Sequence, residues 1–159
     1  MSGPNDFDFF HGEWAVRHRR RTDFLDPESG WEEFPGTSRC LPLFDGAANL
    51  DEVDMPHLSA KGATLRLFDP ESRQWSLYWA SSVSGTLFPP VVGKFQGGRG
   101  EFYGFDTLPV GKDVRVRFVW SGLSVRSARW EQAFSVDDGE TWLTNWIMEF
   151  TRASGTPEG

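Results

Sequence analysis

Residues 127–152 constrain the fold more than any other part of the chain. They form two runs in which apolar residues recur at every second position, and Asp-Asp-Gly at residues 137–139 joins the runs. Period-two runs joined by a short turn that ends in glycine are typical of a β-hairpin. If Val136 and Glu140 close the turn, the register predicts an aromatic face that carries two polar side chains. The opposing pairs on that face are Trp130 and Trp146, Gln132 and Thr144, and Phe134 and Trp142.

The turn has a pattern of its own, Ser135-x-Asp137-x-Gly139-x-Thr141-Trp142. It resembles the Asp-box hairpin of sialidase-like propellers. A propeller would need the motif repeated at a fixed period, and it occurs once here. We therefore expect turn chemistry alone, with Asp137 accepting backbone hydrogen bonds.

Apolar or alternating runs separated by turn residues recur along the rest of the chain. Ahead of them, Asp6 is predicted to cap a helical turn whose phenylalanines, within residues 7–10, form an N-terminal plug. About ten short strands predict an all-β, closed, antiparallel up-and-down β-barrel, because closure leaves no exposed edge. We expect a single domain over residues 1–159, with an ordered core at about 6–152. Besides the hairpin, the predicted strands cover residues 13–21, 31–40, 43–54, 63–68, 74–81, 91–95, 101–107 and 112–120.

Charge and cysteine content exclude several classes of protein. The formal net charge of −7 argues against a nucleic-acid partner, because binding phosphates needs a positive surface. The single cysteine, Cys40, rules out an internal disulfide and a cysteine zinc cluster, and it fits a reducing compartment. The N-terminus lacks the basic and apolar regions of a signal peptide, and there is no apolar run of about 18 residues. We therefore expect a cytoplasmic protein without membrane insertion.

Gly12-x-Trp14 opens the first predicted strand and Arg152 ends the last one. In these features the chain resembles the calycin superfamily, which includes the lipocalins and fatty-acid-binding proteins. The resemblance implies that Trp14 lies at the closed end of the barrel under Arg152, where a guanidinium over an indole is a favourable contact. The chain resembles more closely a bacterial lipocalin-like family of uncharacterised function, through Asp-Phe-x-Phe-x-x-Gly-x-Trp at residues 6–14, Trp-Glu-Gln-Ala-Phe-Ser at 130–135 and Asn-Trp-x-Met-Glu-Phe-Thr-Arg at 145–152.

The haem-binding calycins called nitrobindins differ from this chain. They use a proximal histidine late in the sequence, whereas His11, His18 and His57 all lie near its beginning. Their glycine-rich first-strand pattern also fails after Trp14. Because haem iron needs an axial ligand on the lumen wall, we predict no haem. We also predict no other cofactor and no metal.

If Trp14 and Arg152 point inward, alternation along each strand assigns the remaining lumen residues. A single β-bulge would reverse part of the assignment. The predicted cavity is aromatic with few polar groups, which is typical of a small-molecule site. Its polar members His18, Gln132, Thr144 and Arg152 are candidates to orient a ligand. The full set of predicted ligand-binding residues is Trp14, His18, Trp79, Tyr103, Phe118, Trp120, Trp130, Gln132, Thr144, Trp146 and Arg152.

Three functions fit these observations, and the preferred one is binding of a small apolar or aromatic ligand in the lumen. An enzyme of the lyase or isomerase type would use His18 as its acid or base. With the strand faces reversed, it would use a polar set: Arg117, Glu131, Asn145 and Glu149. The sequence contains no nucleophile elbow or phosphate-binding loop. Alternatively, the eight tryptophans and 14 phenylalanines fill the barrel, and the protein acts by self-association, for instance as a homodimer.

Overall fold

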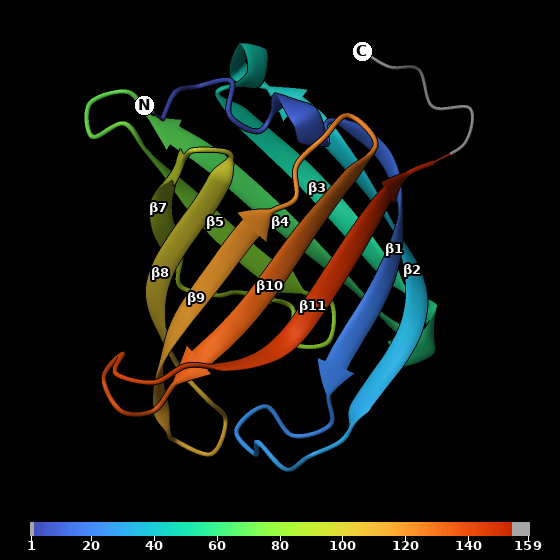
Figure 1. The fold of residues 1–159 in the computed structure, drawn as a ribbon, viewed down its shortest axis with the longest axis vertical. Coiled ribbons are helices and arrows are strands. Elements are labelled where there is room, and N and C mark those ends of the chain that lie inside the picture. Colours follow the sequence, from blue (N-terminus) through green and yellow to red (C-terminus); the bar gives the residue numbers. More distant parts are fainter. Residues whose placement is uncertain (1, 154–159) are drawn as a thin grey trace.

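Within residues 2–153, the part of the chain that the computed structural model describes, eleven strands form one antiparallel sheet (Figure 1). Strands adjacent in sequence pair with each other, except that β5 pairs with both β6 and β7. Because β1 also pairs with β11, ten strands close into the predicted up-and-down barrel, and β6 only extends β5. The strands are β1 (Gly12–Arg21), β2 (Trp31–Leu43), β3 (Ala48–Met55), β4 (Ala60–Asp69), β5 (Gln74–Ser81), β6 (Thr86–Leu87), β7 (Val91–Gln96), β8 (Arg99–Thr107), β9 (Asp113–Ser121), β10 (Ser127–Ser135) and β11 (Leu143–Arg152).

The N-terminal segment closes one end of the barrel (Figure 1). The predicted helical turn is the 3-10 helix η1 (Asp8–Phe10), and Phe7 and Phe10 are fully buried. Phe7 meets Trp75 edge-on with ring centroids 4.9 Å apart, and Phe10 meets Trp120 at 4.8 Å. The plug therefore forms the first aromatic layer of the core. Two more 3-10 helices, η2 (Phe44–Gly46) and η3 (Pro56–Leu58), lie between strands, and no helix of residues 2–153 is long and apolar enough to cross a membrane.

The predicted capping role of Asp6 is wrong. No side chain caps η1. The Asp6 carboxylate instead accepts hydrogen bonds from Ser2 Oγ at 2.5 Å, Gly3 N at 2.9 Å and Trp75 Nε1 at 3.3 Å. Asp6 thus ties the start of the chain to β5.

Trp14 and Arg152 make the contact that the calycin resemblance implies. The two residues are paired across β1 and β11, and the Arg152 guanidinium carbon lies 4.0 Å from the centre of the Trp14 ring. Arg152 also donates hydrogen bonds to the main-chain oxygens of Phe9, at 2.7 Å, and His11. These contacts hold the plug against the first and last strands.

The hairpin of β10 and β11 forms, but its register differs from the prediction. Residues 136–142 all lie in the connecting loop, so Trp130 pairs with Met148. The register then shifts after Gln132, where Asn145 is the extra residue of a β-bulge in β11. The longer loop and the bulge together make three predicted pairs wrong: Trp130 with Trp146, Gln132 with Thr144, and Phe134 with Trp142.

Asp137 organises this loop by turn chemistry, as predicted. Its carboxylate accepts hydrogen bonds from Thr141 Oγ1, from Thr141 N at 2.9 Å and from Ser135 Oγ at 2.7 Å. These bonds, those from Thr141 first, lower the pKa of Asp137 to about 2. Gly139 has a φ of 89°, the left-handed conformation expected of a glycine at the end of the turn.

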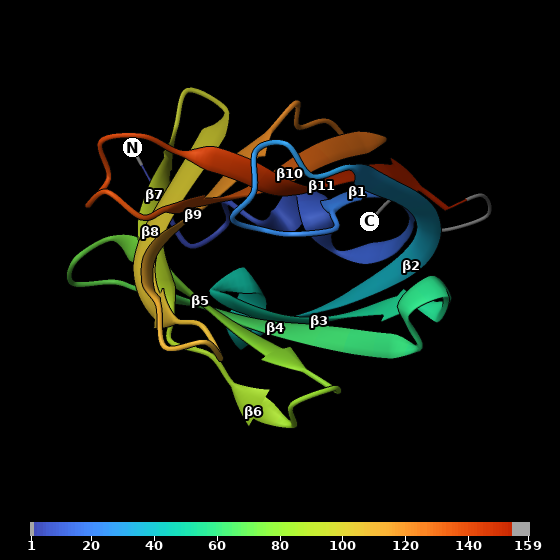
Figure 2. The same cartoon turned by 90° about the horizontal axis from the view of Figure 1, so that it is seen from below.

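The β1–β2 loop lies at the barrel end opposite the plug (Figure 1), and Figure 2 views the barrel from that end. Its Phe24 meets Phe134 edge-on with ring centroids 5.7 Å apart. The Arg20 guanidinium carbon lies 4.5 Å from the Phe24 ring centre and 4.8 Å from that of Trp146. An arginine in contact with aromatic rings therefore stands at each end of the lumen.

Candidate ligand site in the barrel lumen

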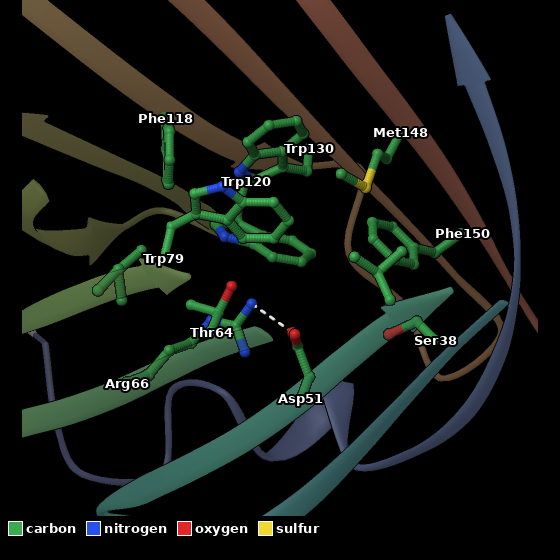
Figure 3. A pocket seen from close by; sticks show the side chains of 12 residues that line it. Ser38, Asp51, Thr64, Arg66, Trp79, Phe118, Trp120, Trp130, Met148 and Phe150 are labelled. Atoms are coloured by element: carbon green, nitrogen blue, oxygen red, sulfur yellow. Dashed lines mark ion pairs between the residues drawn. The ribbon is translucent and has the colours of Figure 1, made fainter. Parts of the chain in front are cut away.

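A cavity lies in the lumen between two walls of different character (Figure 3). The wall on β9 and β10 carries two tryptophans and a phenylalanine, whereas the wall on β3 and β4 carries an ion pair. The empty space between the lining side chains is about 400 Å³, including the part open to solvent, and about 30 Å³ of it is wide enough for the centre of a water molecule. The space is therefore narrow. Its lining residues are Ser38, Asp51, Val53, Thr64, Arg66, Leu77, Trp79, Phe118, Trp120, Trp130, Met148 and Phe150.

The polar wall is built around a buried ion pair between Arg66 and Asp51. Arg66 Nη2 lies 2.6 Å from Asp51 Oδ2, and Arg66 Nη1 donates to Asn49 Oδ1 at 2.7 Å. Arg66 is 4% exposed, Asp51 5% and Asn49 0%. Burial raises the pKa of Asp51, and the neighbouring Arg66 opposes that rise. The pair therefore holds two charges away from water, each dependent on the other.

Arg66 also connects the cavity to the plug. Its guanidinium carbon lies 5.2 Å from the ring centres of Phe7 and of Phe10, and 5.4 Å from that of Trp120. Such contacts stabilise a cation at the negative face of an aromatic ring. The position of Arg66 is thus fixed from both sides, by oxygen atoms and by rings.

Several polar atoms around the cavity have no hydrogen-bond partner. Among the lining residues these are Ser38 Oγ, Arg66 Nε and Trp120 Nε1, and beside them stands Asn49 Nδ2. None of the four residues is more than 4% exposed. Because an unpartnered buried donor is unfavourable by about 1–3 kcal/mol, this cavity is a place where a water molecule or a ligand atom would be stabilised.

Trp79 forms the side of the cavity that faces solvent. It is the one lining residue that is not fully buried. Its indole lies across Gly62 of β4, where a Cβ atom would stand 1.8 Å from Trp79 Cη2. It also meets Trp146 edge-on with ring centroids 5.9 Å apart. Gly62 therefore provides the room that Trp79 occupies.

The predicted ligand-binding residues fall into distinct groups. Four of them, Trp79, Phe118, Trp120 and Trp130, line the cavity. Trp146 packs edge-on against two of these four rings without lining the cavity itself. Trp14 and Arg152 belong to the closed end described above, and they also do not line the cavity.

His18 lies inside the barrel, as predicted, but outside the cavity lining. It has no exposed surface, and its ring stacks on Phe34 with centroids 4.7 Å apart. Nδ1 accepts a hydrogen bond from Trp146 Nε1 at 3.1 Å, which leaves the proton of the neutral ring on Nε2. Burial, helped by the positive charge of Arg20, lowers the pKa of His18 to about 4. The ring is therefore neutral near pH 7.

The bulge at Asn145 changes the partner predicted for Gln132. Gln132 Nε2 donates to Asn145 Oδ1 at 2.9 Å, and both side chains are buried. Thr144 pairs with Ala133 beyond the bulge, so alternation places it on the outer face. The predicted lumen position of Thr144 is therefore wrong, because the extra residue reverses the strand faces at that point.

Tyr103 is also placed outside the lumen, contrary to the prediction. Its neighbour Phe102 is fully buried, whereas Tyr103 is 45% exposed and its hydroxyl donates to Glu101 Oε1 at 2.8 Å. Its ring meets that of Trp142 with centroids 5.9 Å apart. In β8, Phe102 takes the inward position, because the apolar ring fills the core and the tyrosine hydroxyl keeps a polar partner.

The polar wall was not predicted from the sequence. Asn49 and Asp51 share one alternation parity with Val53, and Thr64 and Arg66 share one in the next strand. Antiparallel pairing sets Asp51 opposite Thr64 and makes the two polar pairs neighbours. Polar residues at positions that alternate with exposed ones are the signal that points to this wall.

The comparisons with known proteins bear on the fold. No protein-family model and no curated protein matches the sequence. Among solved structures, the S-type phycobiliprotein lyase CPES from Guillardia theta has a TM-score of 0.59 and 11% identity over 98% of this chain and 94% of that chain. The structure of EF1p2_mFAP2b bound to DFHBI has a TM-score of 0.37 and 11% identity, over 96% of this chain and 100% of that chain. The likeness to the lyase shows a shared fold.

Proposed function

We propose that this protein binds a small, mostly apolar, aromatic ligand in the lumen cavity, past Trp79. The observation that carries the proposal is the set of unpartnered polar atoms on Ser38, Arg66 and Trp120 around that cavity. A closed core normally pairs its buried polar groups. Five aromatic side chains of the lining supply the apolar contacts that small-molecule sites use.

The ion pair in the cavity wall also supports binding over simple filling. Replacing a buried ion pair with apolar residues of similar volume is often neutral or stabilising, so a barrel that needed only a core would gain nothing from Arg66 and Asp51. Their charges remain useful if they orient a bound molecule. Only about 30 Å³ of the space is wide enough for the centre of a water molecule, so binding requires the half-buried Trp79 to move aside and enlarge the cavity.

An enzyme that uses His18 fits this arrangement less well. Its Nε2 is buried outside the cavity lining, where no reactant would contact it. The alternative polar set is divided between the two faces of the sheet. Asn145 is buried, whereas Glu131 and Glu149 pair with Arg129 and are partly exposed. That set does not converge on one reacting atom.

A fluorescence titration with N-phenyl-1-naphthylamine, an uncharged aromatic probe, tests the proposal. Saturable enhancement with one site per chain is expected. Because Trp79 separates the cavity from solvent, Trp79→Ala is expected to speed probe association in stopped-flow experiments. Trp142→Ala is the matched control, since Trp142 contacts Tyr103 on the outside of the barrel and should leave the rate unchanged.

Two results would contradict the proposal. One is the absence of saturable binding to the wild-type protein. The other is an equal response of Trp79→Ala and Trp142→Ala, which would place the probe on the outer surface.

A second candidate function is self-association, and one observation favours it. Leu41, Leu50, Leu65 and Tyr78 lie opposite one another across β2, β3, β4 and β5. They alternate with the lumen residues, and Leu41 and Leu50 are 54% and 43% exposed. An apolar row of this kind on an outer sheet face suits contact with a second copy of the chain. Sedimentation equilibrium distinguishes this candidate, because Leu50→Lys should convert a dimer to a monomer without changing probe binding.

A further inference from the structure

We infer that the ligand is an uncharged planar molecule that presents a carbonyl-type hydrogen-bond acceptor to Trp120 and Arg66. This inference rests on the proposed function and concerns the chemistry of the same cavity. It follows from three properties of the lining: the kind of polar atom left unpartnered, the charge balance of the wall and the aromatic rings that face the space.

The unpartnered atoms in the lining are all able to donate a hydrogen bond. Trp120 Nε1 and Arg66 Nε can only donate, and Ser38 Oγ can donate or accept. Two side-chain acceptors beside them, Asp51 Oδ2 and Asn49 Oδ1, are already held by Arg66. A ligand that completes the site must therefore bring an acceptor rather than a donor.

The charges of the wall are already balanced. Arg66 and Asp51 form a pair 2.6 Å apart, with both side chains nearly excluded from water. A carboxylate or sulfonate on the ligand would add a second negative charge beside Asp51, and an ammonium would add a second positive charge beside Arg66. Unpaired charge is strongly disfavoured where water is excluded. A neutral acceptor such as a ketone or amide oxygen avoids both problems.

The rings that line the space favour a flat, aromatic molecule. The ion pair forms one wall and the rings of Trp120, Trp130 and Phe118 form the other (Figure 3). Little of the space between them is wide enough for the centre of a water molecule. An aromatic or conjugated ring system packs well against these rings once Trp79 moves aside and widens the space, and its edge would bring the acceptor to the indole N–H.

Two naphthalenes that differ at one substituent test the inference directly. 2-Acetylnaphthalene carries a carbonyl oxygen that 2-ethylnaphthalene lacks, and both displace N-phenyl-1-naphthylamine if they share its site. The wild-type protein is expected to bind the acetyl compound about fivefold more tightly, as one net hydrogen bond implies. In Trp120→Phe, which removes the N–H and keeps an aromatic ring, the ratio should fall towards one.

Trp130→Phe is the matched control, because it makes the same exchange in the same cavity and should keep the wild-type ratio.

1-Anilinonaphthalene-8-sulfonate tests the charge argument, since it is N-phenyl-1-naphthylamine with a sulfonate added. It should bind at least tenfold more weakly than N-phenyl-1-naphthylamine. Equal affinities for the two naphthalenes, an unchanged ratio in Trp120→Phe, or preference for the sulfonate would each overturn the inference. If N-phenyl-1-naphthylamine binds while the ratio is one, only this inference fails and a water molecule satisfies the donors. If no probe binds, the proposed function fails with it.

Discussion

Replacing Arg66 with methionine should make the stability of the barrel strongly dependent on pH. The substitution keeps an unbranched side chain between the plug rings but leaves Asp51 without its cation. Asp51 is 5% exposed, so its carboxyl group will take up a proton in the folded state rather than stay charged. The ordinary pKa of an aspartate is 3.8, and each pH unit above it adds about 1.4 kcal/mol to the free energy of that protonation. The loss of stability relative to the wild-type protein is therefore at most about 4 kcal/mol at pH 7 and about 1.5 kcal/mol at pH 5, and it is smaller to the extent that burial already raises the pKa of Asp51 beside Arg66.

The sign of the pH effect follows from the direction of the pKa shift. In Arg66→Met the folded-state pKa of Asp51 lies above its unfolded value, so the folded state binds the extra proton and stability falls as pH rises from about 4. Urea unfolding followed by tryptophan fluorescence at pH 5 and pH 7 measures this difference. The double variant Arg66→Met with Asp51→Asn, which cannot titrate, should lose the added pH dependence. If Arg66→Met loses the same stability at both pH values, Asp51 is not charged in the wild-type protein and the ion-pair interpretation is refuted.

Three further predictions concern other parts of the barrel. The pKa of His18 is lowered from 6.5 to about 4, so the stability of the wild-type protein should fall by up to about 3 kcal/mol as pH drops from 6.5 to 4. Urea unfolding of His18→Gln should lack this fall, and a pH profile identical to that of the wild-type protein would contradict the prediction. Asp137→Ala should lower the melting temperature and speed amide hydrogen exchange at Thr141. Because the pKa of Asp137 is about 2, the stabilisation that its carboxylate gives the wild-type protein should persist at pH 4 and disappear as pH falls towards 2. Unchanged exchange at Thr141 would count against the loop contacts. Arg152→Met should free the plug, so that limited proteolysis cuts near Phe9 faster than in the wild-type protein, whereas equal cleavage rates would show that other contacts hold it.

The barrel could be predicted from the sequence because its main signals are local. Alternation in runs such as residues 112–120 sets strand faces directly, and turn residues separate the runs. The pairing of Trp14 with Arg152 then fixed which strands close the sheet. Lumen residues such as Phe118 and Trp130 followed from the same parity, and the structure places both in the cavity lining.

The register of the last hairpin could not be fixed by parity. A three-residue turn at residues 137–139 and a loop of residues 136–142 give the same alternation for Trp130 and Gln132, since the registers differ by an even number of residues. Only the bulge at Asn145 breaks parity, and nothing in the local sequence marks it. The turn motif points to a loop longer than three residues, because Asp137 accepts hydrogen bonds from Ser135 Oγ and from Thr141 N, six residues apart in the sequence.

The candidate site was predicted only in its aromatic half, because the sequence does not reveal which aromatic rings pack against one another and which face an opening. Most lumen rings of the closed end are in contact, as Phe10 is with Trp120 and Phe150. The lumen is then capped at each end by an arginine against a tryptophan, Arg152 on Trp14 and Arg20 on Trp146. Between these caps, the barrel holds the ion pair of Arg66 and Asp51 beside the buried N–H groups of Arg66 Nε and Trp120 Nε1. Such an arrangement depends on long-range pairing of β3 with β4 and of β9 with β10, which local sequence patterns do not fix.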